Sequence, residues 1–174
     1  IDLNDAVKVD DQEALDAALE NIGENDIILL SGGTYELSAT VSGDLTIVGT
    51  GNVVIEAVDA TSVSGIYMNS GNLTVSGVDF VAGSTEGYAR GIHTAGGYNG
   101  TITVVDCTFD GLTTGIFLNG CNNITVESCT FTDCTAGIGV DSLTGTLQIT
   151  DCTFSGNGED IGIGAGVSAG DKVI

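Results

Sequence analysis

Two acidic side chains are the first candidates for chemistry. Asp106 and Asp151 occupy equivalent positions in two similar segments, with Ser128 at the same position between them. A glycosidase needs two carboxyl groups about 5 to 10 Å apart, and residues two strands apart in one stacked sheet would lie ~10 Å apart. Residues at such corners usually make turn hydrogen bonds instead. The sequence therefore favours a structural role for both aspartates and predicts no catalytic residue and no enzymatic activity.

Several aromatic side chains, the one histidine and the one arginine are expected close together. Tyr67, His93 and Phe117 are expected in one outward-facing column, which continues through Gly139 and Gly164. Two longer connections beside this column, 81–90 and 96–100, add three more side chains. Exposed rings around a single arginine are typical of a surface that binds a sugar or a protein, whereas a loop folded over the rings would make them core. We expect one exposed binding patch, formed by Tyr67, Tyr88, Arg90, His93, Tyr98 and Phe117.

The five cysteines follow the hydrophobic pattern. Cys107, Cys129 and Cys152 stand where an earlier segment has Val78, and the other two cysteines align with leucines. Free cysteine behaves as a small buried hydrophobe. No Cys-x-x-Cys pair and no second histidine is present, so we expect buried free thiols and neither a metal site nor a cofactor.

Three glycosylation sequons begin at Asn72, Asn99 and Asn123. Their recurrence has a structural explanation, because the corner before a strand favours asparagine and the strand favours an outward threonine. Glycosylation of the three asparagines is the alternative.

Internal repeats determine where these residues lie. The segment Leu73–Phe80 recurs at 102–109, 124–131 and 147–154, and each copy is followed by a Gly-Ile pair. Alternating apolar residues in such short segments indicate strands, and a strand this short needs its copy stacked on it. We expect an all-β parallel solenoid of about five or six coils. Its inward columns end with Cys152, Phe154 and Ile163.

The first forty residues break the repeat. Residues 11–22 have an apolar face and an aspartate at the start, the pattern of an amphipathic helix that ends at Gly23. A helix there would cover the exposed edge of the first coil. We therefore predict one domain, 1–174, with a cap region at 1–40 and coils over 41–174.

Three segments carry a resemblance to a known family: 12–19 (QEALDAAL), 26–37 (DIILLSGGTYEL) and 45–51 (LTIVGTG). Together with the repeats, they resemble the pectate-lyase-like right-handed β-helix superfamily. The resemblance implies a single-stranded right-handed parallel β-helix. That superfamily includes polysaccharide lyases and hydrolases, phage tailspikes and non-catalytic surface proteins. The Asn-Thr-Asp and Gly-His-Gly blocks of the hydrolases are missing, and the one Asp-Asp lies at the cap helix. A non-catalytic member is implied.

Charge narrows the range of partners. Acidic residues outnumber basic ones 24 to 3, for a formal net charge of −21. Such a field repels nucleic acid, anionic lipid and polyuronates, and no apolar run is long enough to cross a membrane. The remaining partners are copies of the chain, a carbohydrate or a cell-surface protein.

Two functions from different classes stay open. The first is an extracellular structural protein that assembles head to tail into a surface filament or layer through an uncapped carboxyl end, with Lys172, Val173 and Ile174 in the contact. The second is a carbohydrate- or receptor-binding module of a larger adhesin, and a polysaccharide lyase or hydrolase relative is a weaker third. All three imply a secreted or cell-surface protein.

Overall fold

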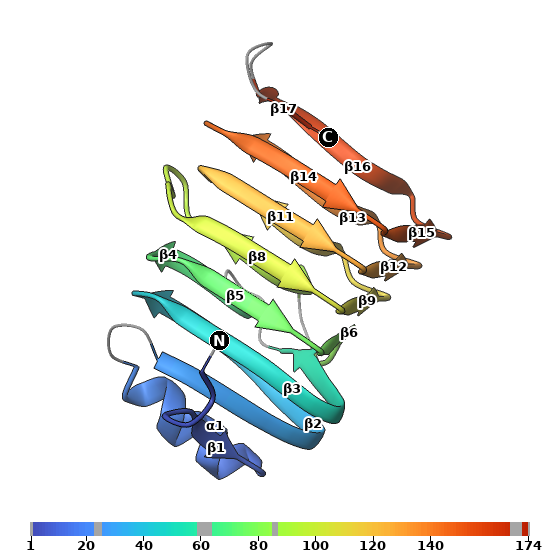
Figure 1. Ribbon diagram of the computed structural model, residues 1–174. Coiled ribbons are helices and arrows are strands. Elements are labelled where there is room, and N and C mark those ends of the chain that lie inside the picture. Colours follow the sequence, from blue (N-terminus) through green and yellow to red (C-terminus); the bar gives the residue numbers. More distant parts are fainter. Residues whose placement is uncertain (1, 23–25, 59–63, 85–86, 168–171, 174) are drawn as a thin grey trace.

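Stacked strands form most of the chain (Figure 1). The computed structural model describes residues 2–22, 26–58, 64–84, 87–167 and 172–173. All strand pairs for which a register is given are parallel. The strands are β1 (Val7–Val9), β2 (Asp26–Ser42), β3 (Leu45–Ala57), β4 (Gly65–Ser70), β5 (Leu73–Ser76), β6 (Asp79–Ala82), β7 (Arg90–Thr94), β8 (Thr101–Val105), β9 (Thr108–Asp110), β10 (Thr114–Leu118), β11 (Asn123–Glu127), β12 (Thr130–Thr132), β13 (Ala136–Ser142), β14 (Thr146–Thr150), β15 (Thr153–Ser155), β16 (Glu159–Gly166) and β17 (Lys172–Val173).

Each coil has three faces. The long face stacks β2, β3, β5, β8, β11, β14 and β17, and the short face stacks the end of β3 with β6, β9, β12 and β15. The return face stacks the end of β2 with β4, β7, β10, β13 and β16. Because six strands follow one another on the return face, the solenoid has about six coils, in agreement with the sequence prediction.

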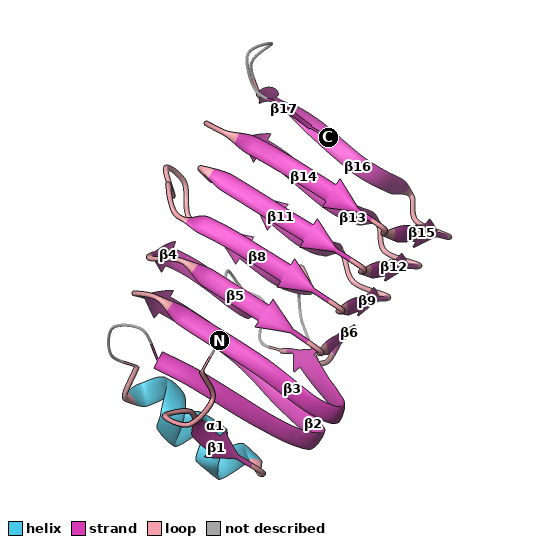
Figure 2. Ribbon diagram, viewed as in Figure 1, coloured by secondary structure: helices cyan, strands magenta, loops and turns pink. Residues whose placement is uncertain are grey.

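One helix, α1 (Gln12–Glu20), lies with β1 at the amino-terminal end of the stack (Figure 2). The Asp11 carboxylate accepts a hydrogen bond from the Ala14 amide at 2.8 Å and begins the helix. Leu15 of this helix is buried, so the expected cap helix is confirmed. The predicted end at Gly23 lies outside the described residues. The helix ends at Glu20, where the Asn21 side chain donates to the Ala17 carbonyl at 2.8 Å. Among the described residues, no helix has both the length and the apolar character needed to span a membrane.

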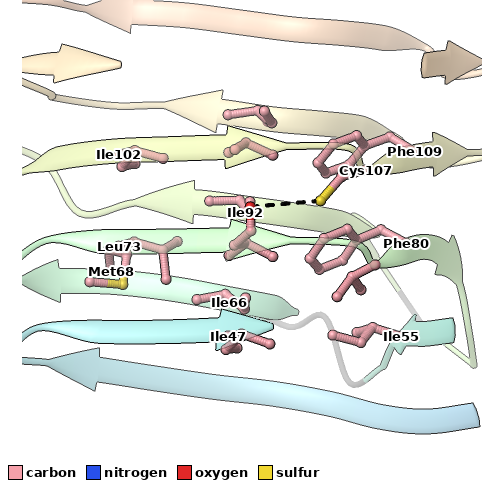
Figure 3. Packing of buried hydrophobic residues seen from close by; sticks show 14 of the residues in the cluster. Ile47, Ile55, Ile66, Met68, Leu73, Phe80, Ile92, Ile102, Cys107 and Phe109 are labelled. Atoms are coloured by element: carbon pink, nitrogen blue, oxygen red, sulfur yellow. Dashed lines mark hydrogen bonds between the residues drawn. The ribbon is translucent and has the colours of Figure 1, made fainter. Parts of the chain in front are cut away.

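Identical side chains stack in the interior. The rings of Phe80, Phe109, Phe131 and Phe154 lie 4.7 to 4.9 Å apart and within 6° of parallel, and Figure 3 shows the first two of them. Their spacing is the distance between neighbouring strands of a sheet, so one ring per coil builds a continuous column. The register pairs Phe80 with Phe109, Phe109 with Phe131 and Phe131 with Phe154, as the repeats predict.

The last coil departs from the predicted register. Ile138 pairs with Ile161, and Val140 pairs with Ile163, whereas the repeats predict Ile163 beside Ile138. A shift by two residues keeps every side chain on its own face. The run Ile-Gly-Ile-Gly therefore fits both registers by pattern alone. Backbone hydrogen bonds from Gly158 to Cys134 and from Glu159 to Thr135 select the observed one.

Candidate functional site

The predicted column of rings is present on the return face. Tyr67 pairs with His93, His93 with Phe117 and Phe117 with Gly139. The rings of Tyr67 and His93 lie 4.7 Å apart at an angle of 51°. Tyr67 and Phe117 are partly exposed. The column ends in Gly162, which pairs with Gly139, and the expected Gly164 is two residues further along.

Arg90 packs between two aromatic rings. Its guanidinium carbon lies 4.4 Å from the centre of the Phe117 ring and 5.1 Å from that of Tyr88. Tyr88 is 62% exposed. The Nε atom of Arg90 is buried and has no hydrogen-bond partner among the described residues. Burial lowers the pKa of Arg90, while nearby Tyr88 and Asp141 act in the opposite direction. The arginine therefore offers hydrogen-bond donors at the rim of an aromatic surface.

His93 is buried, contrary to the expectation of an exposed patch. Only 1% of it is exposed, and its Nε2 atom accepts a hydrogen bond from the Ser64 amide at 3.4 Å. Burial first, and then the charge of Arg90, lower the pKa of His93 to about 4. The histidine is thus neutral near pH 7, and its buried ring packs against the ring of Tyr67.

Tyr98 does not belong to the patch, so this part of the prediction is wrong. Its ring is 4% exposed, and its hydroxyl donates to the Gly71 carbonyl at 2.6 Å. A turn closed by the Tyr98 amide and the Ala95 carbonyl directs the ring toward the preceding coil. Burial raises the pKa of Tyr98 well above its usual value. This tyrosine is part of the hydrophobic core.

A hollow of about 300 Å³ opens where the column loses its side chains. Gly139, Gly162 and Phe117 are among the residues that line it, and the Glu159 carboxylate lies beside Gly162. A Cβ atom on Gly139 would lie 3.2 Å from Phe117 Cδ2, so glycine leaves the ring accessible from this side. Asp141 and Glu159 line the hollow and are both exposed. The sequence pattern places Gly139 in the column but misses the two acids, whose only signal is their position beside glycines.

Comparison with known proteins places the chain in a family. The model of the family described as "Right handed beta helix region" matches residues 19–173. The chain belongs to the right-handed β-helix family. Among solved structures, it is similar to a variant of AlyGC, a PL6 family alginate lyase, with a TM-score of 0.51 and 16% sequence identity. The match covers 97% of this chain and 39% of the lyase, so it concerns the fold. No curated protein matches the sequence.

This β-helix uses two of its sequon asparagines for hydrogen bonds between coils. The side-chain Oδ1 atom of Asn72 accepts from the Thr101 amide at 2.9 Å, and that of Asn123 accepts from the Thr146 amide at 3.0 Å. Asn99 is exposed. The inter-coil bonds support the structural explanation for Asn72 and Asn123, while glycosylation of all three stays a prediction.

The predicted assembly residues lie at the far end of the β-helix. Lys172 and Val173 form β17 and pair with Thr146 and Leu147. Ile174 and the side chains of Lys172 and Val173 lie outside the described residues. In the coil before them, Ile163 is 49% exposed, although its partner Val140 is buried. Inward side chains of this coil therefore reach solvent.

The remaining candidates for chemistry occupy structural positions. Asp106, Ser128 and Asp151 have φ values of 52° to 54° at one corner of successive coils, where an earlier coil has Gly77 at 67°. The five cysteines are free, four are buried, and Cys152 in the last coil is partly exposed. Within the described ranges, no group of three acidic, histidine or cysteine residues has the geometry to hold a metal ion.

Proposed function

We propose that the chain is a non-catalytic saccharide-binding β-helix whose binding surface is the return face around Phe117. The hollow beside the Phe117 ring carries this proposal. An aromatic ring column stops at two glycines, leaving a ring-sized space at the end of the stack. A pyranose ring presents an apolar face that can rest on Phe117, as sugars rest on aromatic platforms in binding sites.

The polar groups around the hollow match the edges of a sugar. Asp141 and Glu159 are acceptors for hydroxyl protons, and the Arg90 guanidinium beyond the ring supplies donors. Sugar hydroxyls both donate and accept, so a mixed set of groups around one apolar platform suits them. Most lining groups are exposed or partly exposed, and we expect weak binding, with Kd on the order of 1 mM.

The charge of the chain favours a neutral saccharide. With 24 acidic and 3 basic residues, and two carboxylates in the hollow itself, a polyuronate would be repelled. We do not transfer the substrate of the structural neighbour, an alginate lyase. Secretion or display at a cell surface, where saccharides are met, is part of the proposal.

The basic residues argue against a lyase reaction, and the assay below tests whether Asp141 and Glu159 of the hollow hydrolyse a sugar. Lys8, Arg90 and Lys172 are the only lysine and arginine side chains, and Arg90 is packed between two rings. A proton-abstracting base would need access to a substrate carbon, which this packing hinders. Incubation with neutral oligosaccharides and alginate, followed by chromatography, should give no products, and shortened products would contradict the assignment.

A titration tests the binding. ¹⁵N-labelled protein is titrated with neutral gluco-, manno- and chito-oligosaccharides, with alginate oligosaccharide for comparison. We expect amide shifts at Phe117 and Gly139 with a neutral ligand. Gly139→Ala places a methyl group against Phe117 and should weaken binding about tenfold. The matched control is Gly96→Ala, whose Cβ meets its nearest atom at an ordinary 3.6 Å. Absence of shifts at the return face with every neutral sugar would refute the proposal.

A second candidate, head-to-tail self-association into a filament or layer, is favoured by the exposure of the last coil. Ile163 is 49% exposed there, and Phe154 and Ile161 are only partly buried, whereas α1 packs at the other end. Ten of the 24 acids lie within residues 1–36. Sedimentation velocity should show concentration-dependent polymers that disappear on deletion of residues 170–174. A chain that stays monomeric at high concentration would exclude this function.

A further inference from the structure

The segment that carries Tyr88 and Arg90 lies outside the strand ladder toward the preceding coil. Pairing between β4 and β7 begins at Ile66 and Ile92. Toward the following coil, the segment is held by the Thr113 and Thr114 amides, which both donate to the Ala89 carbonyl. Toward the preceding coil, the hydrogen bonds of this segment within the described residues come from one side chain, that of Ser64.

The Ser64 hydroxyl contacts both residues of the aromatic and cationic rim. It donates to the Tyr88 carbonyl at 2.9 Å, accepts from the Arg90 amide at 2.8 Å, and lies 3.4 Å from the Arg90 carbonyl. Glycine makes this approach possible, because a Cβ on Gly65, at φ +61°, would collide with the Arg90 carbonyl oxygen. One hydroxyl therefore replaces the missing ladder at this level.

His93 fixes the place of Ser64. The Nε2 atom of the neutral His93 ring accepts a hydrogen bond from the Ser64 amide. Because the pKa of His93 is lowered to about 4, this nitrogen stays unprotonated near pH 7 and can accept the bond. Ser64 is 1% exposed, so it cannot touch a ligand. Among the described residues, its hydroxyl bonds to Tyr88 and Arg90, so any effect on the surface that these bonds carry passes through the Tyr88–Arg90 segment.

We infer that Ser64 is a positioning residue, whose hydroxyl sets the Tyr88–Arg90 segment and thereby holds the Arg90 guanidinium over Phe117. The relevance of this to ligand affinity rests on the proposed saccharide site. The geometric part, that loss of the hydroxyl frees the segment, stands independently of any ligand.

The rate of trypsin cleavage after Arg90 measures how firmly the Tyr88–Arg90 segment is held. Trypsin has only two other target residues in the chain, Lys8 and Lys172. In Ser64→Ala, we expect cleavage after Arg90 about tenfold faster than in wild type, as expected for loss of the two hydrogen bonds that this hydroxyl makes with the segment. The matched control is Thr94→Val. It removes another buried hydroxyl of the same sheet, bonded to the Gly120 carbonyl and the Asn119 amide. A general loss of stability would make both variants sensitive.

Saccharide titration of the same two variants separates the two claims. We expect Ser64→Ala to weaken binding several-fold while Thr94→Val binds as wild type does. If wild type binds no sugar, the proposed function fails, and the trypsin result still decides the role of Ser64. If Ser64→Ala resists trypsin as wild type does, or if both variants are cut equally, the inference is overturned.

A measurement on wild type covers the case in which Ser64→Ala does not fold. The Arg90 amide donates to Ser64 Oγ, so its hydrogen exchange should be slowed to within about tenfold of the Ile92 amide in the adjoining ladder. Exchange of the Arg90 amide at the rate of an unstructured peptide would overturn the inference.

Discussion

Replacing Phe109 by alanine tests the stacked core most directly. Its ring is fully buried between Phe80 at 4.9 Å and Phe131 at 4.7 Å. Phe→Ala substitutions in cores cost about 3 to 5 kcal/mol, with the larger values where the site cannot collapse. Phe109 packs against the backbone at Gly91, where a Cβ would come within 2.9 Å of the ring. Because ladder hydrogen bonds hold that backbone, we expect a cost at the upper end, about 4 to 5 kcal/mol.

Phe154→Ala is the matched comparison. Phe154 has the same position in the last coil but a single ring neighbour, Phe131 at 4.9 Å, and it is only partly buried. Its truncation removes one ring contact and leaves a cavity open to water, so we expect about 2 kcal/mol. Urea unfolding followed by circular dichroism measures both variants, provided that the slope of the transition is unchanged. An equal loss of unfolding free energy in the two variants would refute the argument that neighbouring rings on both sides make Phe109 the more costly position.

Three further predictions concern titration, backbone strain and thiols. The pKa of His93 is lowered to about 4 in the folded chain, whereas the unfolded chain protonates this histidine near pH 6.5. The free energy of unfolding should therefore fall by about 3 kcal/mol as pH drops from 6.5 to 4. The difference in unfolding free energy between wild type and His93→Gln should show this pH dependence, and parallel pH profiles of the two proteins would contradict it. Ser128 has φ 54° and an exposed side chain, so Ser128→Val should cost about 2 kcal/mol in thermal unfolding while Ser128→Gly stays within about 0.5 kcal/mol; an equal cost for both would show that strain is not the cause. A thiol assay on denatured, unreduced protein should find all five cysteines free, and a count near one would disprove it.

Most of the fold could be predicted from the sequence because each coil repeats the same short strands. The alternation of apolar residues assigns Ile102, Val104 and Phe109 to the interior, and all three are buried. The periodic spacing then fixes which residue lies above which, as the pairing of Thr125 with Thr103 shows. Stacking of like on like leaves little freedom once two coils are aligned.

The register of the last coil could not be predicted for a physical reason. Side chains alternate with a period of two, so Ile161 and Ile163 are equivalent to any rule based on faces. What separates them is the corner before the strand, where the Asn157 side chain accepts from the Cys134 amide at 3.0 Å and donates to the Phe131 carbonyl at 3.0 Å. This contact joins two coils, and no local pattern contains it.

The candidate site shows the same division between periodic and irregular parts. The pattern places Tyr67, His93 and Phe117 in one column correctly because they lie in repeated strands. It misplaces Tyr98 because the connection that carries this residue occurs once, and its conformation depends on the turn closed at Ala95 and on the Gly71 carbonyl.

The hollow itself follows from an interruption of the repeat. In a solenoid, an outward column of rings covers itself, since each ring shields the next. Gly139 and Gly162 end this shielding at Phe117, while on its other side the column continues through His93, whose ring contacts that of Tyr67 at an angle of 51°. A bound sugar whose ring lies one coil spacing from Phe117 would cover this ring again. Because the aligned repeats alone reveal where an outward column loses its side chains, the same interruption can be sought in other sequences of this family.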